Sequence, residues 1–495
     1  MFKTKVLKAI IIGSGLAGLA CAIRLRKAGW DVDVYESQAT PGGKLQTKWI
    51  GDYRFDLGPS VLTKPEFIQQ LFELCGENAD IHFRVKKPEK IFQYFFEDGT
   101  ILQTYNDRYK TAESLSKSLG IDKNQLLAYL QRSEDIARIT SPVFLERSLH
   151  QLKNYFNKET TYGILHFGKI KAFQSLNQYH LSSFQNPKLV QLFNQYASYN
   201  GSNPYVAPGT LSVIPHFELN EGMYIPENGI HAIVDSLYNL ALRQGVKFHF
   251  NKKVSEIFVH ERKAKGIRIS EGKVLGDAII SNADAWNTWK HLLPKEKFPS
   301  NIQKHQRSSS MVVFYWGVNR NFPELNLHNM FFSGNSQEEY RHIFDLGQVY
   351  NDPSVYVNIT SKEIKGDAPE GKENWFVMTT VPHLNGQDWD ELLKNIRRNV
   401  LSKLNRMLKT DLEPLIEVEE HLEPRIIESR YNSAFGSVYG YSSNSIWSAF
   451  LRQANFEKSI KGLYFCGGSA HPGAGMPLCL LSGKIAAELV QEKSG

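Results

Sequence analysis

Apolar positions in this chain form short continuous runs near its two ends and alternating patterns between them. Residues 9–12 are a continuous apolar run. A helical pattern follows, with four apolar residues on its inner side, Leu19, Ala22, Ile23 and Leu25. Gly29 ends this pattern, and DVDVYE at residues 31–36 alternates as a strand does. This order of strand, helix and strand predicts a βαβ unit with a parallel sheet.

The middle of the chain contains two blocks of different pattern. Residues 71–219 are mostly helical in pattern and rich in Phe, Tyr, Leu and Gln. Residues 285–456 instead combine strand-like runs at 308–318 and 374–382 with a helical run at 389–408. Alternating strands of that kind predict an antiparallel sheet.

Three further segments have strand and helix patterns like those of the N-terminal unit. Residues 222–259 give a strand, a turn and a helix that leads to a strand pair, and residues 276–284 give an apolar strand. A buried strand at 463–468 and a helix at 475–490 close the chain. The sequence therefore predicts an α/β protein whose chain passes repeatedly between two domains.

Composition and charge describe a globular protein. Apolar residues make up 42% and charged residues 22% of the 495 positions, which excludes a disordered chain. The net charge of +7 suits an anionic membrane surface, but the basic residues do not form the runs typical of nucleic-acid binding. The four cysteines are scattered without a metal-site spacing and favour a reducing compartment.

The start of the chain imitates a signal peptide, because three lysines precede an apolar run. Its glycines have a better explanation, since Gly13, Gly15 and Gly18 form GxGxxG between a strand and a helix. These glycines allow a tight turn, close approach of a pyrophosphate and close packing of helix on strand. Glu36 ends the second strand, where it can accept hydrogen bonds from a ribose. The unit predicts dinucleotide binding, and an acid at this position disfavours NADP.

The continuation of this unit points to FAD. Gly42, Gly43 and Lys44 resemble the loop that follows the acidic residue in the flavin amine-oxidase and phytoene-desaturase superfamily. FDLGPS at residues 55–60 resembles the segment beneath the flavin in those proteins. The predicted cofactor-binding residues are Gly13, Ser14, Gly15, Ala17, Gly18, Glu36, Gly43, Lys44, Gly58, Pro59, Ser60, Val254, Asn282, Ala283, Gly467, Gly468, Gly475 and Met476.

The closing segment AHPGAGMPLCLLSG, residues 470–483, identifies the family more narrowly. It resembles the C-terminal signature of bacterial-type phytoene desaturases, in which a glycine loop precedes H-P-G-x-G and an apolar residue before Pro. The bulky residues of PLCLLSG depart from the small-residue run usual in phytoene desaturation. They are more similar to the 1-hydroxycarotenoid 3,4-desaturase branch, although they could also alter packing alone.

The resemblance implies a fold and a domain division. A Rossmann-type FAD domain of the amine-oxidase kind would comprise residues 1–80, 222–284 and 457–495. An interleaved α+β substrate domain would comprise residues 81–221 and 285–456. The helix ending the chain would then point its N-terminus at the flavin and stabilise negative charge there on reduction.

The resemblance also implies the chemistry. A C–C single bond beside a polyene loses a hydride to the flavin and a proton from the neighbouring carbon, without a metal. Asp135 and Arg138 match a D-x-x-R pair of the family, with Asp135 as proton acceptor and Arg138 as its charge partner. The alternative is an exposed helical ion pair. His471 is expected to shape the flavin pocket rather than act as a base.

A carotenoid substrate would have to be taken from a bilayer. Apolar and basic residues are interleaved near residues 140–175, which would suit helices lying in an anionic membrane surface. An amphipathic helix facing the core gives much the same pattern. The predicted location is cytoplasmic, peripherally on the inner membrane, with oxygen or a quinone as electron acceptor.

Three other functions compete with this prediction. A phytoene- or neurosporene-type desaturase shares the pattern apart from PLCLLSG. An amine oxidase or protoporphyrinogen-type oxidase shares the N-terminal unit, and the HPGAG ending disfavours it. A lipid escort resembling the Rab GDP-dissociation inhibitors would use the scaffold without a flavin. The intact glycines and Glu36 argue against the escort.

Overall fold

A parallel sheet of five strands organises one half of the protein. The computed structural model describes residues 6–156, 158–445, 448–449 and 452–493. The strand order is β19 (Leu463–Phe465), β13 (Ala278–Ser281), β1 (Lys8–Ile12), β2 (Asp31–Tyr35) and β9 (Lys247–His249). All neighbours run parallel, and β1 occupies the centre between β13 and β2. The strands predicted at residues 9–12, 31–36, 276–284 and 463–468 are therefore present in one sheet.

Both faces of this sheet are covered, which explains the continuous apolar run of β1. Ala9 and Ile11 face the helices α1 (Leu16–Lys27), α2 (Glu66–Cys75), α9 (Ala232–Arg243) and α16 (Met476–Glu492). Ile10 and Ile12 face a three-stranded antiparallel sheet made of β10 (Glu256–His260), β11 (Lys263–Ile269) and β12 (Gly272–Leu275).

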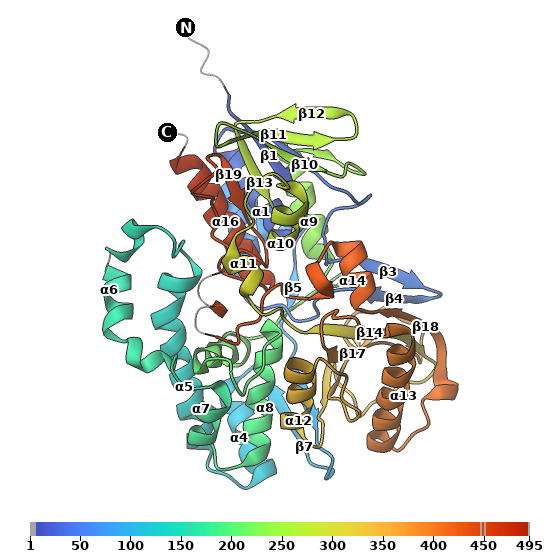
Figure 1. Cartoon of the computed structure of the whole chain (residues 1–495). Helices are drawn as coiled ribbons and strands as arrows, with labels where there is room; N and C mark the ends of the chain where they lie inside the picture. Colours follow the sequence, from blue (N-terminus) through green and yellow to red (C-terminus); the bar gives the residue numbers. More distant parts are fainter. Residues whose placement is uncertain (1–5, 157, 446–447, 450–451, 494–495) are drawn as a thin grey trace.

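The first and last long helices of this layer, α1 and α16, pack directly against each other (Figure 1). Gly483 of α16 lies at the crossing. A Cβ on Gly483 would collide with the Ala17 carbonyl and would lie 3.1 Å from the Ala20 Cβ. Glycine at this position therefore sets how closely the two ends of the chain approach.

A seven-stranded sheet forms the other half. Its order is β18 (Ile416–Leu422), β14 (Ser310–Val318), β17 (Glu373–Val381), β16 (Val355–Asn358), β15 (His328–Phe331), β6 (Lys90–Phe95) and β7 (Ile101–Tyr105). The predicted strands at 308–318 and 374–382 are its central antiparallel pair, β14 and β17. The helix predicted at 389–408 is α13 (Trp389–Leu408), which packs on one face of this sheet through Ile396, Val400 and Leu404.

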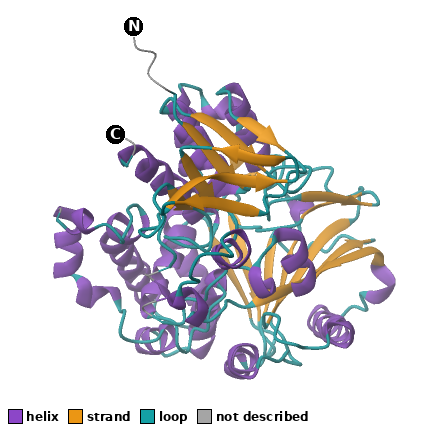
Figure 2. Cartoon of the chain, turned by 45° about the horizontal axis from the view of Figure 1, so that its top comes forward, coloured by secondary structure: helices purple, strands orange, loops and turns teal. Residues whose placement is uncertain are grey.

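The region predicted to be mostly helical, residues 71–219, also supplies β6 and β7. β6 enters the seven-stranded sheet by pairing in parallel with β15, far along the chain. The remaining region is helical and lies beside the sheet (Figure 2). It contains α4 (Arg108–Leu119), α5 (Lys123–Thr140), α6 (Lys158–Leu165), α7 (Leu176–Ser183) and α8 (Pro187–Asn194).

Short elements complete the chain. The helical turns used below are η1 (Ser141–Leu145), η2 (Leu152–Tyr155), η3 (Phe167–Ile170), η4 (Gln195–Asn200), η5 (Gly209–Val213) and η6 (His216–Glu221). Two further strand pairs are β3 (Thr47–Ile50) with β4 (Tyr53–Asp56) and β5 (Val85–Lys86) with β8 (Ile225–Pro226). The remaining α-helices are α3 (Ala79–His82), α10 (Ala285–Asn287), α11 (Ser300–Lys304), α12 (Ser336–Arg341) and α14 (Pro424–Tyr431).

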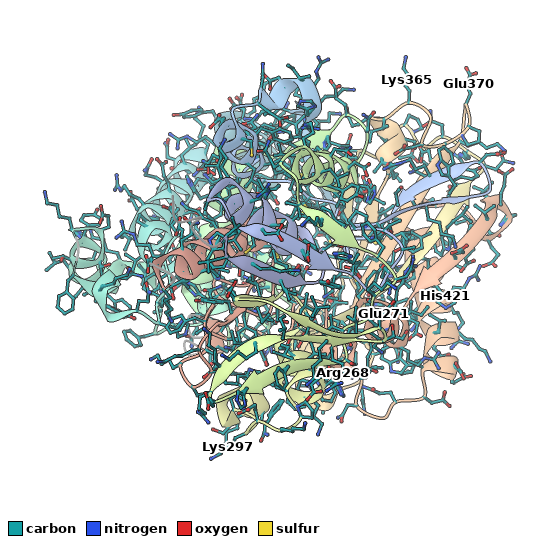
Figure 3. The ribbon with its side chains drawn as sticks, turned by 90° about the horizontal axis from the view of Figure 1, so that it is seen from above. Arg268, Glu271, Lys297, Lys365, Glu370 and His421 are labelled. Carbon is teal, nitrogen blue, oxygen red and sulfur yellow. The ribbon has the colours of Figure 1, made fainter. Side chains whose placement is uncertain are left out.

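Charged side chains cover the outside of the molecule. Lys365 and Glu370 project from its periphery in the view from above (Figure 3). Among the described helices, none has the length and apolar character needed to cross a bilayer. The limits given above for the two domains stay a prediction, although the fold class is that predicted from the sequence.

The crossing at Gly483 gives a first test. We expect Gly483→Ala to lower the free energy of unfolding by about 1–3 kcal/mol, because the added methyl overpacks the contact between α16 and α1. Urea unfolding and the FAD content of the purified protein measure the effect. Gly168→Ala is the control, since a Cβ there has no neighbour within 4 Å. Equal stability of the two variants would contradict the assigned role of this crossing.

Candidate active site

Asn282, at the end of β13, joins the first glycine loop of the chain to the last. Its backbone N–H donates to the Ile12 carbonyl at 2.8 Å. Its side-chain Oδ1 accepts from the Gly18 N–H at 3.0 Å, and its Nδ2 donates to the Cys466 carbonyl at 3.3 Å. A Cβ on Gly467 would lie only 2.6 Å from the Asn282 Nδ2. Asn282 therefore fits between two loops that must both be rich in glycine.

Two helices begin at these loops. α1 starts after Gly15 and α16 starts after Gly475. Because both N-cap residues are glycines, no side chain of the N-cap accepts from the first-turn N–H groups. Both glycines line one cavity. The N–H groups of a first helical turn and the helix dipole favour anionic groups. The two ends of the chain thus direct two positive helix termini at the same space.

The cavity has a volume of about 1590 Å³ and extends from these loops into the seven-stranded half. It is lined by sixteen of the residues predicted to bind the cofactor, Gly13, Gly15, Ala17, Glu36, Gly43, Lys44, Gly58, Pro59, Ser60, Val254, Asn282, Ala283, Gly467, Gly468, Gly475 and Met476. Ser14 and Gly18 lie behind the lining and hold Glu36 and Asn282 respectively.

Glu36 lines the cavity, and three neighbours donate to its carboxylate. The Ser14 N–H and hydroxyl both donate to Oε2 at 2.8 Å. The Gln38 N–H donates to Oε1 at 2.9 Å, and the Ser37 hydroxyl donates to the same oxygen at 3.2 Å. These four donors match the roughly four lone-pair sites of a carboxylate, so a ribose hydroxyl would take the place of a serine hydroxyl, which can rotate away.

Lys44 connects the Gly42–Gly43 turn to the opposite wall. Its ammonium donates to the Val438 carbonyl at 2.6 Å and to the Ser433 hydroxyl at 2.9 Å. Burial lowers the pKa of Lys44. The side chain therefore closes the cavity wall and places a cation beside the glycine loop.

His471 of the closing loop has a structural position. Its Nε2–H donates to the Arg147 carbonyl at 2.8 Å, which ties the loop to the segment after η1. Burial lowers the pKa of His471 to about 3, so the ring is neutral at neutral pH. Arg452 supports the same loop by donating to the Gly468 carbonyl at 3.3 Å. These contacts support the expectation that His471 shapes the pocket.

The part of the cavity beyond the glycine loops is mainly apolar and aromatic. It is lined by Phe92, Met311, Met330, Phe376, Met378 and Leu422. Ser60 hydrogen-bonds the Tyr356 hydroxyl at 2.8 Å where the two parts of the cavity meet. Such a lining suits a long hydrocarbon and excludes water.

Glu218 is a buried acid in this apolar part, and the sequence did not single it out. The residue is 1% exposed and lines the cavity. The Tyr196 hydroxyl donates to Oε1 at 2.7 Å and the Tyr199 hydroxyl donates to Oε2 at 2.6 Å. Burial raises the pKa of Glu218 to about 7, against the lowering effect of the two phenols.

Asp135 and Arg138 form the predicted pair on α5, with 2.8 Å between Oδ1 and Nη2. Their side chains are 39% and 67% exposed, as in a surface ion pair. Arg138 lines the cavity. Asp135 is directed to Arg138, and its role as proton acceptor stays a prediction.

The donor set of the cavity fits a dinucleotide. Glycine loops leave room for phosphates at the α1 N-terminus, and Glu36 supplies ribose acceptors at one end. The N-terminus of α16, at Gly475, follows the closing glycine loop, which Asn282 joins to the first glycine loop. An extended cofactor can therefore contact both ends of the chain.

Known proteins extend this picture. The family described as flavin containing amine oxidoreductase matches residues 16–491. A 1-hydroxycarotenoid 3,4-desaturase of Flavobacterium sp. (strain P99-3) is 45% identical over 483 residues, 98% of this chain and 99% of that protein. A phytoene desaturase of Fusarium fujikuroi is 31% identical over 98% of this chain and 89% of that protein. A solved oxidoreductase of Methanosarcina mazei shares the fold, with a TM-score of 0.66 and 16% identity over 97% of this chain and 100% of its own.

The family match confirms the predicted flavin cofactor and favours an enzyme over a lipid escort. The fold and the paired end motifs agree with it. The chain belongs to the flavin-containing amine oxidoreductase family and, within it, to the carotenoid desaturases that its closing segment predicted.

Proposed function

We propose that this protein is an FAD-dependent carotenoid desaturase that introduces a C=C bond next to the polyene. The observation that carries this proposal is the single cavity in which the glycine loops of both chain ends continue into an apolar, aromatic space. A polyene needs such a lining, and a flavin needs such loops. An amine oxidase would instead have to bind a polar substrate in this apolar part.

The proposed reaction is 3,4-desaturation of a 1-hydroxylated acyclic or monocyclic carotenoid. The relative from Flavobacterium with that name supports it, because it covers nearly the whole chain at 45% identity. The bulky residues Leu478, Cys479 and Leu481 of the closing helix line the cavity and support the same branch. Desaturation of phytoene is the alternative.

The residues lining the loop part of the cavity would hold FAD. Glu36 would accept from the ribose, and the N-termini of α1 and α16 would face the pyrophosphate and the flavin. Bound FAD supplies a two-electron acceptor for hydride. The protein contributes a dry cavity, an oriented polyene and a group that takes the proton.

Asp135 and Arg138 are proposed to act at the cavity rim. Arg138 lines the cavity and holds Asp135 in an ion pair. The family resemblance makes Asp135 one candidate for the proton acceptor. Replacement of Asp135 by Asn tests that role, because the amide cannot accept the proton.

The region of α6 is proposed to dock on a membrane. Three apolar side chains there are almost fully solvent-exposed, Phe156 at 85%, Leu165 at 76% and Phe173 at 83%. α6 stands out from the body of the molecule (Figure 1). Lys158 and Lys169 are exposed beside these residues and would attract anionic lipid. We also propose peripheral binding to the cytoplasmic face of the inner membrane, and oxygen or a quinone as the electron acceptor.

The substrate assignment is tested by pigment analysis. The chain is expressed in cells that make lycopene, its 1-hydroxy derivative or phytoene. We expect added conjugation, seen as longer-wavelength absorption and a mass loss of two hydrogens, only with the hydroxylated substrate. Gly18→Val is the control, because its side chain would clash with Gly13 and Asn282 and remove the cofactor site. Desaturation of phytoene would overturn the 3,4 assignment.

Liposome flotation tests membrane docking. The triple variant Phe156→Ser, Leu165→Ser and Phe173→Ser should lose about 10⁴-fold in lipid affinity, at about 2 kcal/mol for each apolar side chain. The matched control replaces three exposed apolar residues elsewhere by serine, Trp49, Ile81 and Leu275. The wild type should float with anionic vesicles and less at high salt. Equal flotation of the two triple variants would exclude α6 as the docking element.

A further inference from the structure

Glu218 is a buried acid without an opposite charge beside it. Within residues 6–156, 158–445, 448–449 and 452–493, the ionisable groups that act on it are phenols, from Tyr196 and Tyr199 on η4 and from Tyr94 on β6 and Tyr356 on β16. These four phenols remain neutral because burial raises the pKa of each.

The charged groups near η6 are engaged elsewhere. On the same element, Glu221 lies 2.6 Å from the Lys64 ammonium and 3.3 Å from the His216 ring. On α5, which packs against η6, Glu134 pairs with Arg108 at 3.1 Å and Asp135 pairs with Arg138. Glu218 therefore depends on two hydrogen bonds rather than on a counter-ion.

Such an arrangement is costly for a purely structural residue. Burying a carboxylate without an opposite charge costs several kcal/mol, and replacement by an uncharged side chain usually removes that cost. Acids kept in this condition within a cavity are candidates for proton transfer. Each Glu218 oxygen receives one phenol and keeps a second lone pair free to accept a proton.

We propose that Glu218 is the proton acceptor of the desaturation, held in place by Tyr196 and Tyr199; this assignment rests on the proposed function. One C–H bond beside the polyene would break, and its electron pair would leave as hydride to FAD, which the residues of the glycine loops would hold. The adjacent C–H bond breaks heterolytically. Its electron pair becomes the new π bond, and its proton passes to a Glu218 oxygen. The substrate is oxidised by two electrons, and the proposed oxygen or quinone later removes them from the flavin.

Its position favours Glu218 over Asp135 as the proton acceptor. Glu218 lines the apolar part of the cavity, whereas Asp135 is 39% exposed and paired with Arg138. A base with a pKa near the working pH transfers protons most effectively. Burial brings the pKa of Glu218 to about 7. Tyr196 and Tyr199 are positioning residues, because each fixes one oxygen and limits the rise in pKa.

The first experiment compares Glu218→Gln with Asp135→Asn. Each amide keeps the size of its acid but cannot accept the proton. We expect Glu218→Gln to slow anaerobic flavin reduction by the carotenoid about 10²–10⁴-fold with FAD content unchanged, and to slow it more than Asp135→Asn does. A wild-type rate in Glu218→Gln, or a larger loss in Asp135→Asn, would overturn the assignment.

The pH dependence of the rate tests the role of Glu218 in the wild-type protein, which retains this carboxyl group. Glu218 must be deprotonated to act, so the wild-type rate should fall about tenfold per pH unit below a pKa of about 7. Tyr199→Phe removes one donor to the carboxylate and should move this limb to higher pH, because that hydrogen bond lowers the pKa. An unmoved limb would contradict the proposal, since a merely structural tyrosine would leave it in place.

An infrared titration gives a readout independent of turnover. A carboxylic C=O stretch should grow as the pH falls through about 7, and it should be weaker in Glu218→Gln, where the buried acid Glu339, whose pKa burial also raises to about 7, still contributes. Equal bands in the wild type and Glu218→Gln would overturn the assignment. Failure of the wild type to desaturate any carotenoid would instead refute the proposed function, which the pigment analysis detects separately from these variants.

Discussion

The three hydrogen bonds of Asn282 are the constraint on which the site depends. They link the end of β1, the N-terminus of α1 and the strand end before Gly467 through one side chain and its backbone. Two helices that begin hundreds of residues apart consequently open on the same cavity. The crossing of α1 and α16 at Gly483 stabilises this arrangement, because it fixes the distance between those two helices.

The remaining architecture extends the cavity away from that junction. β1 is buried on both faces, so the nucleotide half is rigid, and the seven-stranded sheet presents one face to α13 and the other to the cavity side. β14 and β17 supply Met311 and Met378 to the lining, while the helical region supplies lining residues of η4 and η6, among them Tyr199 and Glu218. The reacting bond of a substrate would therefore lie where the two halves meet.

The sequence predicted those elements that are encoded by short local patterns of apolar residues and glycines. Strands β1 and β13, the glycine loops and α13 could be read from the sequence because apolar periodicity and glycine spacing encode them directly. β6 was missed because its alternation is weak and its sheet position depends on β15, far along the chain. Glu218 was missed for the same reason. Its partners, Tyr196 and Tyr199, meet it only after η4 and η6 fold together, and no spacing rule describes that contact.

Substrate binding and base strength are coupled in this cavity. Burial is the largest cause of the raised pKa of Glu218. A hydrocarbon that fills the apolar lining displaces water and strengthens that effect, so the proton affinity of the carboxylate rises when a polyene is present. The two phenols oppose the rise and so limit protonation of the acid near neutral pH.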